Sequence, residues 1–130
     1  MKDIRIEIEI VAMSYFYKIH YDIKKNKIYH SSLGQWEDLE KKISQNDLNI
    51  FWENLNNIDV WNWKKNYLPD EVIMDGETWE LKLRDNKGNN KYSTGHMVFP
   101  DNFNKLMQAF DDLAGIDYDE DNRFTNYDYE

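Results

Sequence analysis

The first part of the chain alternates apolar and polar residues. Isoleucine recurs at every second position from 4 to 10, separated by Arg5, Glu7 and Glu9. A period of two is typical of a strand with one buried face. Residues 15–23 and 27–33 predict two further strands, rich in aromatic and β-branched side chains. The N-terminal region therefore predicts a three-stranded antiparallel meander.

The turn inside this meander sets a predicted register. A reversal centred on residues 25–26 would pair Ile23 with Ile28 and Tyr21 with His30, so that apolar positions agree across the two strands. In this register His20 and His30 lie on opposite faces of the hairpin, which makes it difficult for them to share a metal ion.

Two later stretches have a helical period. Residues 47–55 place apolar side chains at i, i+3, i+4 and i+7, with Ser44 or Asn46 available as the N-cap. Pro100 and Asp101 are expected to open a second helix that ends before Gly115. Its apolar face is predicted to consist of Phe103, Leu106, Met107, Phe110 and Leu113, and its polar face of Asn104, Lys105, Gln108, Asp111 and Asp112. Residues 36–42 predict a short helical turn.

The segment between these helices predicts more strands. Residues 72–74 and 77–84 form a hairpin candidate around Asp75-Gly76, because Asp-Gly supplies the positive φ angles of a type I′ turn. A second reversal at residues 85–90 would send residues 91–99 back along 79–83. The element order is then βββ-α-β(β)β-α, without β-α alternation. This order favours an α+β fold with an antiparallel sheet of about five to six strands and two helices packed on one face.

Length and charge refine this picture. The chain has 130 residues and a net charge of −9, of which residues 111–130 carry −7. We therefore expect one domain over residues 1–115 and an acidic, flexible tail over residues 116–130. Four tail acids form a candidate surface for a basic protein partner: Asp117, Asp119, Glu120 and Asp121. An acidic chain is repelled by phosphate backbones, which argues against nucleic acid as a partner.

The chain has no cysteine, no N-terminal apolar run of the kind found in signal peptides, and no stretch of about 20 apolar residues. These features predict a soluble cytoplasmic protein without a membrane partner. They leave the oligomeric state open.

Residues 61–103 carry three spacings that resemble a known group of proteins. In chain order they are Trp63-x3-Tyr67, Asp75-Gly76-x2-Trp79-x-Leu81 and Gly95-x4-Pro100-x2-Phe103. The same spacings occur in a group of small, uncharacterised proteins common in Gram-positive bacteria, and the similarity covers residues 47–115. No activity is known for that group. The resemblance therefore implies a shared fold unit and assigns no catalytic residue.

The sequence gives little indication of a metal-binding or catalytic site. His96 has no His or Cys neighbour at ligand spacing. Asp117-x-Asp119-x-Asp121 resembles the start of a calcium loop, but Asn122 replaces the glycine of the sharp turn. The sequence has no Gly-rich phosphate loop and no Gly-x-Ser-x-Gly or His-Glu-x-x-His motif. We therefore expect no metal, no cofactor and no catalysis.

Aromatic residues give the strongest indication of binding. Twenty of the 130 residues are Trp, Tyr or Phe, and Trp and Tyr are enriched at binding hot spots. The candidate binding residues are Trp61, Trp63, Tyr67, Trp79 and His96. An equally weighted structural reading is that the tryptophans at 61 and 63 cover the open end of the sheet.

Three functions follow from these features. The first is a non-catalytic protein-interaction module of the immunity or inhibitor type, including phage or defence-related forms, with an acidic and aromatic surface for a basic partner. The second is a small-ligand binding module with Trp63, Tyr67, Trp79 and His96 around one pocket. The third is an enzyme of unknown type.

Overall fold

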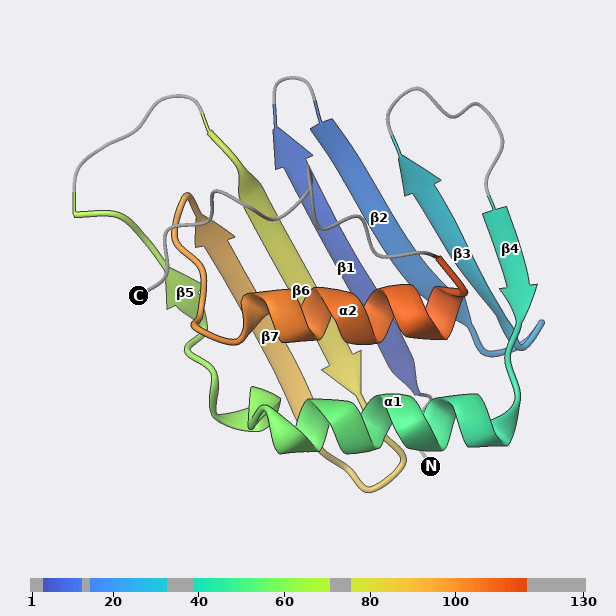
Figure 1. The fold of residues 1–130 in the computed structure, drawn as a ribbon. Helices are drawn as coiled ribbons and strands as arrows, with labels where there is room; N and C mark the ends of the chain where they lie inside the picture. Colours follow the sequence, from blue (N-terminus) through green and yellow to red (C-terminus); the bar gives the residue numbers. More distant parts are fainter. Residues whose placement is uncertain (1–3, 13–14, 33–38, 71–75, 117–130) are drawn as a thin grey trace.

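The computed structural model describes residues 4–12, 15–32, 39–70 and 76–116. Within these residues, seven strands form one sheet and two α-helices pack on one of its faces (Figure 1). In chain order the elements are β1 (Arg5–Ala12), β2 (Tyr15–Asp22), β3 (Lys27–Ser32), β4 (Leu39–Lys42), α1 (Gln45–Asn57), the 3-10 helix η1 (Val60–Asn62), β5 (Asn66–Tyr67), β6 (Thr78–Arg84), β7 (Asn90–His96) and α2 (Phe103–Ala114). The predicted α+β class is confirmed, whereas the predicted count of five to six strands is wrong.

The sheet has the strand order β4-β3-β2-β1-β6-β7-β5. Adjacent strands are antiparallel except for the short β5, which runs parallel to β7. The isoleucines of β1 face the helices and are at most 1% exposed, as their alternation predicts. Figure 1 shows α1 and α2 antiparallel to each other across this face, and among the described residues no helix lies on the opposite face of the sheet. The core therefore lies between the two helices and the central strands.

Two strands were not predicted from the sequence. Leu39–Lys42 is the edge strand β4, not part of a helical turn, because it pairs with β3 and an ion pair of 3.0 Å joins Glu40 to Lys27. The remainder of that predicted turn lies outside the described residues. β5 is only two residues long, Asn66 and Tyr67, too short to show any period in the sequence.

The β2–β3 register differs from the prediction by two residues. Tyr21 pairs with Ile28, and Ile19 pairs with His30. The loop is longer than expected because the Asp22 carboxylate accepts hydrogen bonds from two backbone N–H groups in the turn, at 2.9 and 3.2 Å, and Asn26 adopts a φ of 54°. A shift of two residues leaves each side chain on the face of the sheet that was predicted for it. The prediction that His20 and His30 lie on opposite faces is therefore confirmed.

The prediction that residues 77–84 pair with residues 72–74 in a hairpin around Asp75-Gly76 is wrong. Both edges of β6 are already occupied along its whole length, by β1 on one side and β7 on the other. Gly76 has a φ of 150°, far from the value of about 90° at the second central position of a type I′ turn. Residues 72–74 and Asp75 lie outside the described residues. The second predicted reversal is confirmed, since β7 returns antiparallel to β6, although it ends at His96.

The helix ends follow the sequence closely. Ser44 is the N-cap of α1: its hydroxyl accepts from the Asp47 N–H, and the Asp47 carboxylate accepts from the Ser44 N–H, both at 3.0 Å. α2 begins at Phe103, two residues after the predicted opening at Asp101, and ends as predicted at Gly115 with a left-handed φ of 72°. Among the described residues no helix has both the length and the apolar character needed to cross a membrane.

Candidate functional site

The candidate tryptophan at position 61 is part of the helical side of the molecule. Trp61 is half-buried and stacks on Trp52, with ring centroids 6.0 Å apart and an interplanar angle of 25°. Its indole N–H donates to the side-chain oxygen of Asn56 at 2.7 Å. These contacts join η1 to the last turns of α1, so Trp61 covers this end of the core.

Three other candidate aromatics belong to the core. Trp63, Tyr67 and Trp79 are 8%, 5% and 2% exposed and pack in one aromatic cluster with Phe99 and Phe103. The Trp79 indole donates to the backbone carbonyl of residue 98 at 2.9 Å, and the Tyr67 hydroxyl accepts from the backbone N–H of residue 64 at 3.0 Å. The polar atoms of Trp79 and Tyr67 therefore bond to the protein's own backbone.

His96 lies on the other side of the sheet. It pairs with Thr78, one residue away from the pair formed by Trp79 and Gly95, so its side chain points to the open face. Within the described residues, Trp63 and Tyr67 border one surface hollow, whereas Trp79 and His96 border a different one. The structure therefore does not bring these four residues around one pocket.

The acidic candidates divide between two environments. Asp117, Asp119, Glu120 and Asp121 lie outside the described residues. Asp111, predicted on the polar face of α2, is fully buried instead, and its carboxylate accepts a hydrogen bond of 2.6 Å from the Tyr17 hydroxyl of β2. Asp111 follows Met107 by one turn, at the flank of the apolar stripe, and a sequence period cannot distinguish that flank from the solvent side. The prediction for this residue is wrong.

Breaking this buried hydrogen bond has a measurable consequence. Tyr17→Phe removes the donor and keeps the ring, so we expect the free energy of unfolding to fall by about 2 kcal/mol, the usual range for a hydrogen bond to a carboxylate. Urea denaturation measures the change. Tyr29→Phe on the open face is the matched control and should shift stability by less than about 0.5 kcal/mol. Equal effects of the two substitutions would contradict a structural role for the Tyr17–Asp111 contact.

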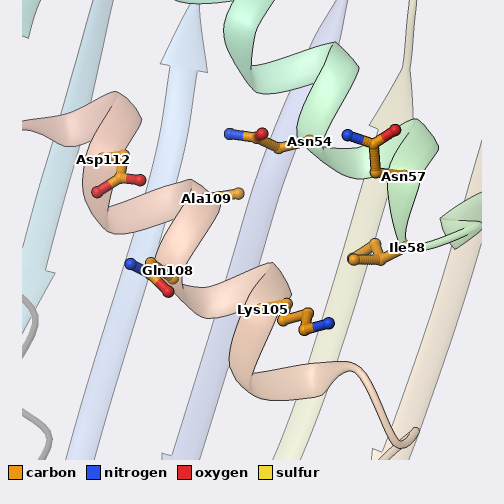
Figure 2. A pocket seen from close by; sticks show the side chains of 7 residues that line it. All are labelled: Asn54, Asn57, Ile58, Lys105, Gln108, Ala109 and Asp112. Carbon is orange, nitrogen blue, oxygen red and sulfur yellow. The ribbon is translucent and has the colours of Figure 1, made fainter.

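A groove runs between α1 and α2 on the solvent side of the helices (Figure 2). It consists of two adjoining hollows of about 390 and 150 Å³, which share Asn54, Ala109 and Asp112. Figure 2 shows the larger hollow, with side chains contributed by both helices. The groove is lined by Asn54, Asn57, Ile58, Lys105, Gln108, Ala109 and Asp112, and at its other end by Asp47, Ile50, Phe51 and Leu113. Sequence reasoning missed this groove, because surface amides carry no period of their own.

Charge is distributed unequally between the two sides of the molecule. We define the helical layer as residues 45–62 and 101–114. Its solvent-accessible charges are Asp47, Glu53, Asp59, Asp101 and Asp112 against Lys105. By strand alternation the open sheet face carries Arg5, Lys18, Lys27, Lys42, Lys82 and Arg84 against Glu7, Glu9, Asp22, Glu40 and Glu80. The helical layer is therefore acidic, whereas the sheet face is nearly balanced.

One carboxylate of the helical layer, that of Asp47, is stabilised in its charged form by its own helix cap. Hydrogen bonds from the Ser44 backbone N–H and hydroxyl hold the pKa of Asp47 below its usual value. On the open face, by contrast, Glu80 is engaged by neighbours: the Tyr92 hydroxyl donates to it at 2.8 Å and Lys82 lies 3.1 Å away.

A metal centre finds no support among these residues. Within the described parts of the chain, no three His, Asp or Glu side chains gather closely enough to hold an ion. His20 instead stacks on Tyr29, with centroids 5.1 Å apart.

Comparison of the chain with protein-family models, curated proteins and solved structures gave no match. Any functional assignment therefore depends on the geometry and charge described above.

Proposed function

We propose that this chain is a non-catalytic protein-interaction module of the immunity or inhibitor type, which binds a basic protein partner through its helical layer. The observation that carries the proposal is the acidic, amide-rich surface formed around the groove between α1 and α2. The non-catalytic part rests on the sequence, which has no catalytic motif.

The composition of α1 supports this proposal. Surface helices commonly pair acids with Lys or Arg one turn away, which neutralises the charge locally. α1 contains Asp47 and Glu53 but no basic residue, so its acids have no such partner within the helix. Charge of one sign attracts a partner of the opposite sign and accelerates its association. A surface rich in Lys and Arg is the complement.

Charge reversal on the helical layer tests the proposal. The variant Glu53→Lys with Asp112→Lys changes two exposed acids without touching the core. The test is quantitative affinity capture from the native host. We expect the variant to capture at least tenfold less of a basic protein that the unmodified chain enriches, because the charges of the helical layer then repel that partner.

The matched control is Glu9→Lys with Glu40→Lys on the open sheet face, which changes net charge by the same amount. It should retain the partner. If both variants retain it equally, or if no basic protein depends on the helical layer, the proposed function is wrong. Thermal denaturation of both variants confirms that each is folded.

A further inference from the structure

We propose that the groove between α1 and α2 binds a short extended peptide segment with a Lys or Arg at one end and a carboxylate at the other. This inference rests on the proposed function and specifies the chemistry of the partner.

The groove has the dimensions of a peptide site. It extends along α1 from Asp47 to Ile58. At a rise of about 1.5 Å per helical residue this length is roughly 16 Å. An extended chain advances about 3.3 Å per residue, so the groove accommodates about five residues. Its floor includes Ala109, whose small side chain lets a backbone approach closely.

One end of the groove suits a long basic side chain. Asp47 and Asp112 supply two negative charges there against the single positive charge of Lys41, whose ammonium lies 3.5 Å from the Leu113 carbonyl oxygen. Ile50, Phe51 and Leu113 supply apolar surface beside them. Ile50 is 48% exposed, so its side chain is accessible to a ligand in this end of the groove. Lys and Arg lay their methylene stems on apolar surface and direct the charged head to carboxylates. The chemistry of this end therefore matches both parts of such a side chain.

The other end has the opposite charge. Lys105 projects from α2 toward Ile58 at the C-terminal end of α1 (Figure 2). Within the described residues neither Lys105 nor Asp112 forms an ion pair. The groove thus carries a negative charge at one end and a positive charge at the other. A segment with the reverse order of charges fits in a single orientation, with its carboxylate at Lys105.

The middle of the groove can pair with a peptide backbone. Asn54, Asn57 and Gln108 each offer an amide donor and an amide acceptor. None of the three forms a side-chain hydrogen bond within the described residues. An extended backbone presents N–H and C=O groups in alternation, and side-chain amides can satisfy both kinds. A helical partner would instead require a continuous apolar groove. Here the large apolar side chains lie at the two ends, Ile50, Phe51 and Leu113 at one and Ile58 at the other, with amides between them.

A library of six-residue peptides tests the inference on the full-length chain. Peptides are displayed with free and with amidated C-termini, and affinities are measured by fluorescence polarisation. We expect the bound peptides to carry Lys or Arg three to four residues before a carboxylate. Preference for a free C-terminus would identify a chain-terminal carboxylate, whereas equal binding of both forms would identify an acidic side chain.

Exchange of the two end charges makes the test decisive. Lys105→Asp with Asp112→Lys keeps the net charge and should switch preference by at least tenfold toward peptides with the reversed charge order. The matched control, Lys65→Asp with Asp70→Lys, makes the same exchange at two exposed positions away from the groove and should leave the preference unchanged.

Bound peptides without a charge order, or a preference that survives the exchange, would overturn the inference. A basic partner that depends on the helical layer but is not displaced by the selected peptides would also overturn it and would leave the proposed function intact. Failure of the proposed function itself is recognised separately, by a partner that the charge-reversed helical layer still captures.

Discussion

Replacing Trp79 with alanine is expected to lower the free energy of unfolding by about 3–5 kcal/mol, the range for deleting a large buried aromatic side chain. The indole is 2% exposed and contacts four aromatic rings, with centroid distances from 5.1 to 6.3 Å. Its N–H also donates to the Val98 carbonyl. The substitution therefore removes packing on several sides and leaves the Val98 carbonyl, which is partly buried, without its donor.

Chemical denaturation monitored by circular dichroism measures this loss. Trp61→Ala is the matched control, because Trp61 is half-buried and contacts mainly Trp52 and Asn56. Its cost should be clearly smaller, about 1–2 kcal/mol. If the two substitutions cost the same, the distinction between a core tryptophan and one that covers the end of the core is wrong.

This contrast bears on the three spacings that sequence analysis singled out between residues 63 and 103. Within Trp63-x3-Tyr67, Asp75-Gly76-x2-Trp79 and Gly95-x4-Pro100-x2-Phe103, the described aromatic residues pack in one cluster. The packing of that cluster is sufficient to explain the spacings of these aromatic residues in this chain. The candidate site lies on other residues, along the outer sides of α1 and α2.

Much of the fold could be predicted because local signals and burial coincide. The alternating isoleucines of β1 and the capping box from Ser44 to Asp47 each act within a few residues, so the sequence displays them directly. The β2–β3 register depends instead on which backbone groups the Asp22 carboxylate accepts from, a detail that a pattern of apolar residues does not contain. β4 is defined by its pairing with the preceding strand β3, and the two-residue β5 by its pairing with the distant β7, and the apolar pattern of neither segment indicates a strand.

The candidate site was harder to predict than the fold. Sequence analysis singled out aromatic residues because their large rings contribute strongly to binding surfaces. The same large apolar area also favours their burial in a core. The groove is formed by ordinary surface residues such as Asn54 and Gln108, and it exists only because two helices lie side by side. Asp111 is the opposite case: the helical pattern predicts an exposed acid at this position, but its side chain is buried and bonded to Tyr17.

Gly95→Ala is expected to destabilise the fold by about 3 kcal/mol, at the upper end of the usual cost of overpacking a core. Gly95 is buried, and a Cβ atom there would clash with the Trp79 indole nitrogen and lie 2.7 Å from the Val98 carbonyl oxygen. The indole cannot easily move away, because it is enclosed by other rings and bonded to that same carbonyl. Gly88→Ala is the control: nothing lies within 4 Å of its Cβ position, and its φ of 93° gives a purely backbone cost of about 1 kcal/mol.

A double-mutant cycle separates the steric cost from other effects of the glycine. In a Trp79→Leu background the indole atoms that clash with the new methyl group are absent, so Gly95→Ala should cost about 2 kcal/mol less than in the unmodified chain. The remaining cost reflects the Val98 carbonyl, which belongs to the backbone and stays in place. Gly88→Ala should cost the same in both backgrounds. If Gly95→Ala costs as much in the Trp79→Leu background as in the unmodified chain, the glycine is not required by the approach of the indole, and the Gly-x4-Pro spacing needs another explanation.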